Sequence, residues 1–278
     1  MRKCVKLADD ARKAYLAEKG VTTRREAFVA LSLGPFGSAV TPPQDFDGFY
    51  PPPFGPKGPT KDGVGNTRLF SLDPGPAAAA VKEEEKAIEA LAQFHLWRLR
   101  AVASNPETWN AIDYVAFETV PHLRELRAIK LAMSKLDVEI QTQGGALNKL
   151  RGWWISLVFP NGEESPQWGP EEREHQTRSL RLGLDITHES QILNVVLDHK
   201  VGAVPTGLGL NCTRIDQYPS ILSSIVLTSS SKSVPGEKIP IPLTLVVYPN
   251  GGRFGDTFDY PPPIDGQMTE GHGPTVGT

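Results

Sequence analysis

The sequence lacks the features that mark several large classes of protein. It contains two cysteines in 278 residues, Cys4 and Cys212, so a framework of disulfides cannot be the source of its stability. So few cysteines are typical of a reducing compartment. No run reaches the ~18 apolar residues that cross a bilayer, and the stretch from Met1 to Asp10 lacks the apolar core of a signal peptide. These absences predict a cytoplasmic protein that does not associate with membranes.

An excess of charge of one sign is also lacking. The chain carries 29 Lys and Arg against 32 Asp and Glu, which gives a net charge of -3. Without a basic field to attract phosphates, the composition does not indicate a nucleic-acid partner. A P-loop, a Gly-x-Ser-x-Gly elbow and a His-x-x-x-His pair are missing as well. We therefore expect neither a nucleoside triphosphatase, nor a serine hydrolase, nor a metal site built from histidines.

What the sequence does contain is a succession of short apolar runs separated by helical patterns. Apolar runs that Gly and Pro interrupt predict buried strands at 28–33, 114–117, 153–159, 207–211 and 243–248. Apolar residues at helical spacing predict helices at 1–18, 77–104, 123–135, 191–199 and 218–227. Strands and helices that alternate in this way are typical of the α/β class, as a doubly wound sheet or a (β/α)8 barrel. A Gly-x-Gly-x-x-Gly motif after the first run is missing, which weighs against a dinucleotide-binding fold.

Two stretches differ from the rest of the chain in composition. Residues 41–76 are rich in Pro and Gly, and proline removes a backbone donor, so we expect a loop or insertion there. Residues 256–278 are rich in Gly, Pro and Asp without periodicity, which predicts a disordered tail. Residues 1–255 are then expected to form one domain that carries the insertion.

Polar side chains follow three of the predicted strands directly: Glu118, Cys212 and Asn250. In both candidate folds the C-terminal ends of parallel strands carry the functional site. A thiolate at Cys212 is a suitable zinc ligand, but free cysteine is also among the most buried residue types. Glu118 could hold an amino group or act as a base, or it could cap a helix that begins near Pro121. From the residues alone, both interpretations of each side chain stay open.

Five stretches together resemble the homocysteine S-methyltransferase family. In chain order they are Leu31-Ser-Leu-Gly-Pro-Phe-Gly-Ser38, Asp45-Phe-Asp-Gly-Phe-Tyr50, Asp113-Tyr-Val-Ala-Phe-Glu-Thr119, Gly207-Leu-Gly-Leu-Asn-Cys-Thr213 and Val246-Val-Tyr-Pro-Asn-Gly-Gly252. They are similar to the family's third-strand motif, the segment after it, and the ends of its fourth, sixth and seventh strands. The resemblance covers residues 1–255 and implies a (β/α)8 TIM barrel of which strands three to seven are recognisable.

The resemblance also implies a reaction, the transfer of a methyl group to the sulfur of homocysteine to give methionine. By the family pattern, Cys212 is a zinc ligand, Glu118 holds the amino group of homocysteine, and Asn211 lines the same pocket. Zinc would stabilise the homocysteine thiolate that attacks the methyl carbon. The implied donors are S-methylmethionine or S-adenosylmethionine, and both are sulfonium ions.

Two motifs of the family have no counterpart in this sequence. One is an Asp-Gly-Gly/Ala-Thr type motif on the first strand, and the other is the Gly-Gly-Cys-Cys pair after the eighth, which provides two zinc ligands. Zinc sites use three or four protein ligands, and five strands cannot close an eight-stranded barrel. One alternative is therefore a truncated, inactive homocysteine-binding or interaction protein, and another is a chain that pairs with a second chain, such as its own copy. A third is an unrelated α/β enzyme with Glu118 as general base.

Overall fold

The computed structural model describes residues 1–55 apart from 22, 24, 25, 42 and 47, then 77–142, 149–159, 188–223 and 243–250. Part of the predicted insertion, 56–76, and the whole predicted tail, 256–278, lie outside these residues. The elements in chain order are α1 (Arg2–Glu18), β1 (Ala30–Leu33), η2 (Phe36–Ala39), α2 (Ala77–Ala103), α3 (Pro106–Ala111), β2 (Tyr114–Val120), α4 (Leu123–Thr142), β3 (Gly152–Leu157), α6 (His188–Leu197), β4 (Gly207–Arg214), η3 (Ile215–Gln217) and β5 (Thr244–Asn250).

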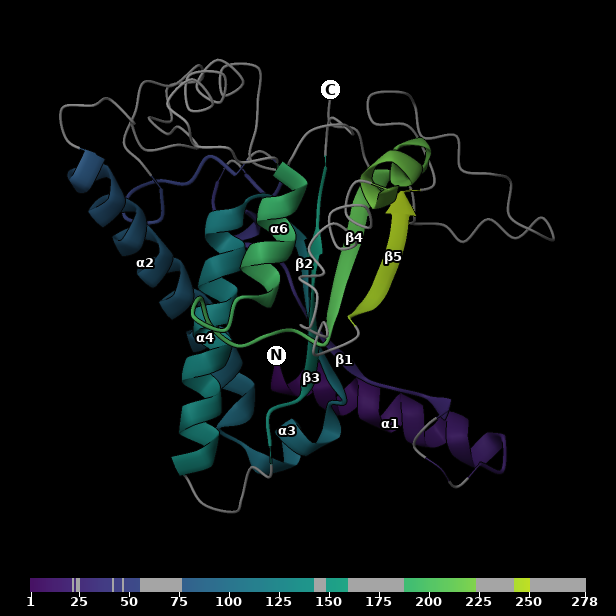
Figure 1. Ribbon diagram of the computed structural model, residues 1–278. Helices are drawn as coiled ribbons and strands as arrows, with labels where there is room; N and C mark the ends of the chain where they lie inside the picture. Colours follow the sequence, from purple (N-terminus) through teal and green to yellow (C-terminus); the bar gives the residue numbers. More distant parts are fainter. Residues whose placement is uncertain are drawn as a thin grey trace, which may run out of the picture.

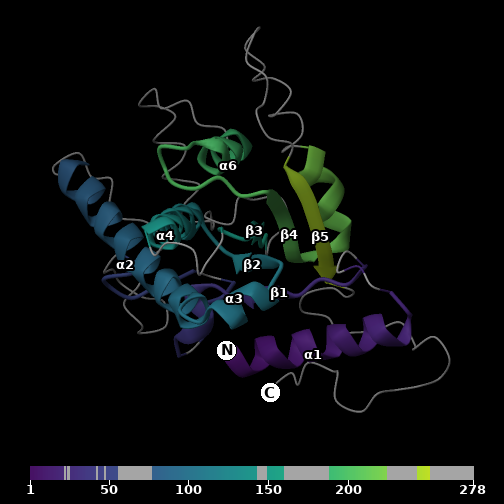
Figure 2. The same ribbon diagram turned by 90° about the horizontal axis from the view of Figure 1, so that it is seen from below.

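The strands form one parallel sheet whose spatial order follows the chain order, β1-β2-β3-β4-β5. Helices α2, α4 and α6 lie together along one side of this sheet in two perpendicular views (Figures 1 and 2). A doubly wound sheet reverses its strand order at a switch point, and the described strands show no reversal. The α/β class is thus confirmed. The order is the one that a (β/α)8 barrel requires, although these five strands do not by themselves show a closed barrel.

The two faces of the sheet differ because successive side chains on a strand point to opposite sides. One face is apolar, is buried and packs against the helices: Leu31, Leu33, Val115, Phe117, Trp153, Ile155, Leu157, Leu208 and Leu210. The register places mostly small or polar residues on the other face, together with one valine and two aromatic residues: Ser32, Ala116, Trp154, Ser156, Gly207, Gly209, Thr244, Val246 and Tyr248. The apolar face therefore holds the helices, and the other face is left for polar functions.

Helix α4 joins the helical layer through a buried charge. Lys130 is fully buried, and its ammonium donates to the carbonyl oxygens of Val195, Val196 and Asp198 at 2.5, 2.6 and 2.9 Å. Carbonyls at the C-terminus of a helix have no partner within the helix, and a positive charge there opposes the negative end of the helix dipole. Burial lowers the pKa of Lys130 to about 8, so the side chain is mostly charged at neutral pH.

Helix α1 lies across the N-terminal ends of the strands (Figures 1 and 2). Arg12 Nη1 donates to Asp113 Oδ2 at 2.8 Å, and the same oxygen accepts the backbone N–H of Val29 at 2.8 Å. Asp113 precedes β2 and Val29 precedes β1, so one carboxylate ties α1 to the start of two neighbouring strands. The edge of the sheet that α1 covers is therefore opposite to the one where Glu118 and Cys212 lie.

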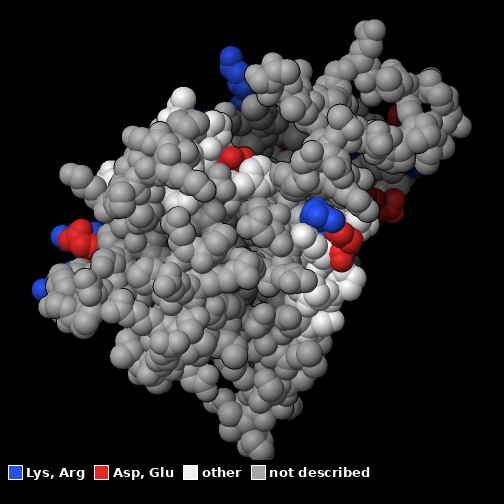
Figure 3. Space-filling model, turned by 90° about the horizontal axis from the view of Figure 1, so that it is seen from above, with Lys and Arg blue, Asp and Glu red and all other residues white. Residues whose placement is uncertain are grey.

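The surface at the other edge is seen from above in Figure 3, from the side toward which the strands run. The charged side chains that are visible among the described residues there form small separate groups and no continuous field of one sign. Among the described helices, none combines the length and the apolar character that crossing a bilayer requires.

Gly209 provides a test of how closely the sheet is packed. A Cβ at this position would lie 2.2 Å from Ser156 Oγ and 2.9 Å from the carbonyl oxygen of Val246. We expect Gly209→Ala to lower the free energy of unfolding by about 1 to 3 kcal/mol, because a buried methyl group would have to displace backbone. Denaturant titration measures this change. The control is Gly34→Ala, whose Cβ meets only the movable Ser38 side chain, at 3.0 Å; equal stability of the two variants would contradict the packing described here.

Candidate active site

Two backbone irregularities mark the C-terminal ends of β2 and β4. Thr119 has a φ of 59° and Cys212 a φ of 49°, in the left-handed region that residues other than glycine seldom adopt. The pairing of both strands with their neighbours shifts register at the same two points. Such irregularities redirect side chains and are concentrated at functional sites. They make this edge of the sheet the candidate site.

The side chain of Asn211 connects the two irregular segments. Its Oδ1 accepts the backbone N–H of Thr119 at 2.8 Å, and its Nδ2 donates to Thr119 Oγ1 at 2.8 Å and to Cys212 Sγ at 3.2 Å. The Thr119 hydroxyl also donates to Cys212 Sγ, at 3.6 Å. Asn211 is only 2 % exposed, so these hydrogen bonds are shielded from water. The thiol of Cys212 is therefore fixed next to the residue that follows Glu118.

The carboxylate of Glu118 is flanked by hydroxyl groups from two other strands. Ser32 on β1 donates its hydroxyl to Glu118 Oε2. Tyr248 on β5 donates its hydroxyl to Ser156 Oγ at 2.8 Å. Burial, and then the nearby charge of Glu118, raise the pKa of the Tyr248 phenol. The carboxylate thus lies in a polar group assembled from β1, β2, β3 and β5.

Of the residues predicted from the sequence, Asn211 and Cys212 lie together and contact Thr119, the residue that follows Glu118. The helix-cap interpretation of Glu118 is wrong, because His122 caps α4 by accepting the backbone N–H of Glu125 at its Nδ1, at 3.1 Å. Asn250 ends β5, and its side chain lies outside the part of the chain that is described.

Sequence reasoning missed three members of this site, Ser32, Thr119 and Tyr248. For Ser32 and Tyr248 a signal was available in the alternation of side chains along a strand. This alternation places both residues on the face that does not pack against the helices. No signal in the sequence indicated the conformation of Thr119, because residues with a left-handed backbone are usually Gly or Asn.

The comparison with known families identifies the chain. A sequence profile described as homocysteine S-methyltransferase matches residues 1–270. The chain belongs to the homocysteine S-methyltransferase family. Searches of the curated proteins and of the solved structures found no match. Membership confirms the resemblance carried by the five motifs, and it overturns the interpretation as an unrelated α/β enzyme.

Zinc is the cofactor that membership in this homocysteine S-methyltransferase family implies. Among the residues that the structure describes, no three His, Cys, Asp or Glu side chains lie together in a way that could hold a metal ion. The partners of the Cys212 sulfur are the amide of Asn211 and the hydroxyl of Thr119, which are not the usual zinc ligands. The other cysteine, Cys4, is exposed on α1. The described residues therefore do not fit a zinc site.

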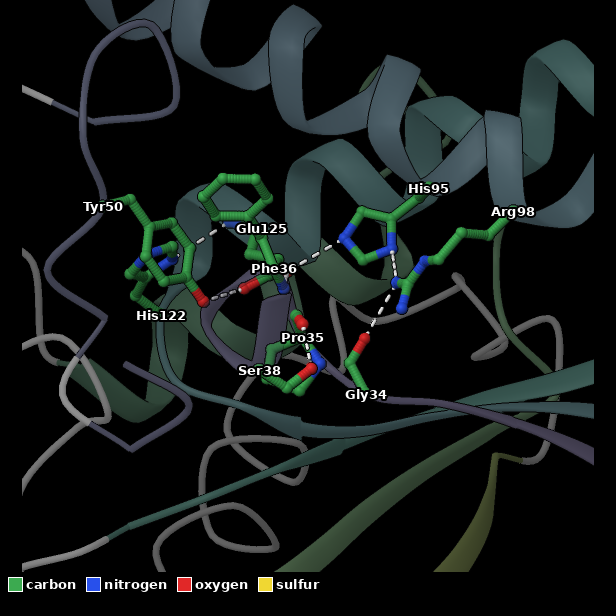
Figure 4. A network of polar contacts seen from close by, with 9 residues as sticks. All are labelled: Gly34, Pro35, Phe36, Ser38, Tyr50, His95, Arg98, His122 and Glu125. Atoms are coloured by element: carbon green, nitrogen blue, oxygen red, sulfur yellow. Dashed lines mark hydrogen bonds and ion pairs between the residues drawn. The ribbon is translucent and has the colours of Figure 1, made fainter. Parts of the chain in front are cut away.

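A second polar cluster, which we call the Glu125 network, lies in the core (Figure 4). Glu125 Oε1 accepts the backbone N–H of Phe36 at 2.6 Å and Nε2–H of His95 at 2.9 Å, and Oε2 accepts the Tyr50 hydroxyl at 2.5 Å. Glu125, His95 and Tyr50 are fully buried. The Glu125 carboxylate on α4 thereby binds His95 of α2, and Phe36 and Tyr50 of the segment that follows β1.

Arg98 completes the Glu125 network and fixes its protonation. Its Nη2 donates to His95 Nδ1 at 2.6 Å and to the carbonyl oxygen of Gly34 at 2.8 Å. An imidazole that accepts at Nδ1 carries its proton at Nε2, and burial lowers the pKa of His95, so this histidine is neutral. Burial raises the pKa of Glu125. The hydrogen bond from His95, the positive charge that His95 and His122 carry when protonated, and the hydrogen bond from Tyr50 together outweigh this effect and lower the pKa to about 2. Burial lowers the pKa of Arg98 to about 10, so it stays charged and balances the carboxylate.

The Glu125 network predicts loss of stability in acid. The pKa of Glu125 falls from 4.5 in the unfolded chain to about 2, and that of His95 lies below its ordinary value of 6.5. In these windows the unfolded chain binds more protons, so stability decreases as the pH falls. We expect the free energy of unfolding to decline below about pH 6.5, with Glu125 contributing up to about 3 kcal/mol of the loss by pH 2.

The variant Glu125→Gln tests this assignment. Without the carboxylate, the protein should be less stable at pH 7 by about 2 to 4 kcal/mol and should lose less stability between pH 5 and pH 2. Urea titration at a series of pH values gives both quantities. Glu85→Gln, at an exposed position on α2, should stay within about 0.5 kcal/mol of the wild type. An acid dependence that is the same in Glu125→Gln as in the wild type would show that the pKa of Glu125 does not differ between the folded and the unfolded chain.

Proposed function

We propose that the chain binds homocysteine at the C-terminal edge of its sheet and transfers a methyl group to the homocysteine sulfur, giving methionine. The observation that carries this proposal is the contact of Asn211 with both Thr119 and Cys212. Through this contact, a carboxylate on β2 and a thiol on β4 belong to one site. The family to which the chain belongs supports the same reaction.

The two ends of homocysteine match the two parts of this site. Its ammonium is suited to Glu118, because a hydrogen bond between opposite charges is stronger than a neutral one. Ser32 donates its own hydrogen to Glu118, so its oxygen remains able to accept from the same ammonium. The thiol end then extends toward Cys212. Holding both ends of a small substrate supports catalysis, because it removes most of the orientational entropy from the barrier.

The methyl donor in this proposal is a sulfonium ion, S-methylmethionine or S-adenosylmethionine. The homocysteine thiol releases its proton to solvent water, and its sulfur forms a bond to the methyl carbon. The bond between that carbon and the donor sulfur breaks, and the donor leaves as a neutral thioether. The described residues contribute binding and orientation to this reaction, and no step is assigned to zinc.

One observation favours a second function, the binding of homocysteine without turnover. Among the described residues no three His, Cys, Asp or Glu side chains could hold a metal ion together, and Cys212 is the one cysteine at this edge of the sheet, where the family pattern implies three. Zinc content per chain, measured by elemental analysis after gel filtration, together with methionine formation from either sulfonium donor, separates the two functions. Binding of homocysteine with neither zinc nor methionine formation would select the second.

Cys212→Ser tests the sulfur end of the proposed site. The variant should abolish methyl transfer and remove any zinc that the purified protein holds, because a serine hydroxyl is a much poorer zinc ligand than a cysteine thiolate. The measurement is methionine formation from homocysteine with each donor. Cys4→Ser is the matched control, since Cys4 is exposed on α1 at the opposite edge, and it should keep full activity. Undiminished turnover in Cys212→Ser would exclude any part for this thiol.

Glu118→Gln tests the part of the proposed site that holds the amino group of homocysteine. The amide keeps the size of the side chain but removes the charge, so the Kd for homocysteine should rise about 10- to 100-fold, as for the loss of a hydrogen bond to a charged group. Calorimetric titration measures this value whether or not the protein turns substrate over. Zinc content should be unchanged, and loss of both zinc and homocysteine binding would mean that Glu118 supports the fold instead.

A further inference from the structure

Helix α1 has two faces of opposite character. The face toward the rest of the protein is narrow and mostly charged, because the buried residues of the helix are Val5, Asp9 and Arg12. A second set of residues, at the same spacing of three and four, is exposed, and all its members are apolar: Cys4, Leu7, Ala8, Ala11, Ala14 and Tyr15. We call this set the outer α1 face. It reverses the usual arrangement of a surface helix, in which the apolar side is the buried one.

The two largest side chains of the outer α1 face are well exposed. Leu7 is 69 % exposed and Tyr15 is 46 % exposed, although the ammonium of Lys19 lies 6.0 Å from the centre of the Tyr15 ring. Apolar surface that continues along a helix in this way is typical of a site of protein interaction.

We propose that the outer α1 face binds the same face of a second copy of this chain, with the two helices antiparallel around a twofold axis at Ala11. In such a contact both copies contribute the same residues. The contact goes beyond the proposed function, because α1 lies at the edge of the sheet opposite to the candidate site (Figures 1 and 2). Both candidate sites of the dimer then stay accessible.

The outer α1 face matches itself when its direction is reversed. In an antiparallel pair centred on Ala11, positions at equal distances before and after this residue oppose one another. Leu7 therefore meets Tyr15 of the other copy, and Ala8 meets Ala14. The alanines allow the helix axes to approach to about 8 Å. Leu7 and Tyr15 then pack beside each other at both ends of the contact.

The charges of α1 favour a second copy as the partner and an antiparallel direction. Lys3 lies in the first turn and Glu18 at the last position, and α1 has no acidic residue in its first turn and no basic residue in its last. This is the reverse of what the helix dipole favours. Antiparallel pairing brings Lys3 of one copy next to Glu18 of the other, on the same side of the contact, and so compensates both charges. Parallel pairing would instead bring like charges together.

The experiment is sedimentation equilibrium of the full chain under reducing conditions. A contact of one helix from each copy is small, so we expect a reversible dimer with a Kd on the order of 10 to 100 µM. Ala11→Glu and Ala11→Lys should each raise this Kd at least about 10-fold, because two like charges meet at the twofold axis. An equimolar mixture of these two variants should form a dimer again, since opposite charges then meet there.

Ala17→Glu is the matched control. It makes the same change at an exposed position of the same helix, but outside the outer α1 face, and it should keep the Kd of the wild type. Circular dichroism of each variant verifies that the fold is kept. The direction of the helices is tested by Lys3→Glu and Glu18→Lys. Each alone should weaken the dimer about 2- to 5-fold, and the two together should restore it.

A wild-type chain that stays monomeric up to about 500 µM, well above the expected Kd, would overturn a second copy as the partner. A dimer that Ala11→Glu does not weaken, or a mixture of Ala11→Glu with Ala11→Lys that stays monomeric, would overturn the placement of the contact on this face. Each copy has its own candidate site, so these results do not depend on whether the protein forms methionine.

Discussion

The arrangement of the site depends on the side chain of Asn211, which holds together the ends of two strands that are not neighbours in the sheet. Backbone conformations such as those of Thr119 and Cys212 cost on the order of 1 to 3 kcal/mol each, and they persist only if other interactions compensate. A buried hydrogen bond contributes about 1 kcal/mol, and Asn211 forms three, two of them to Thr119 and one to Cys212. An amide can do this because it presents an acceptor and two donors in one plane.

The two polar clusters of the protein have opposite characters. The Glu125 network is sealed in the core, its carboxylate is fully satisfied, and it attaches α2 and the segment after β1 to α4. Glu118 is only half-buried, and the hydrogen bonds around it join hydroxyl groups of β1, β3 and β5. His122 lies between them in the chain and begins α4. One cluster is thus sealed from water, and the other is partly open to it.

Much of the fold could be predicted, because apolar runs that Gly or Pro interrupts correspond to the strands, and because a helix needs an apolar stripe. Helix α3 was missed although Asn105 caps it through the N–H of Thr108 and Pro106 opens it, a signal that only a search for caps would find. The last residues of β2 and β4 were also missed, since polar residues with an irregular backbone do not follow a strand pattern. Asn211 and Cys212 were predicted by resemblance. Their contact with Thr119 was not, because register shifts cannot be counted from sequence.

The left-handed backbone at Thr119 and Cys212 limits which substitutions can stabilise the protein. Glycine at either position would relieve roughly 1 kcal/mol of conformational strain. At position 119 it would also remove the hydroxyl that accepts from Asn211 and donates to Cys212, and at position 212 it would remove the sulfur that both groups contact. Relief of the backbone strain would therefore take away the side chains from which the candidate site is built.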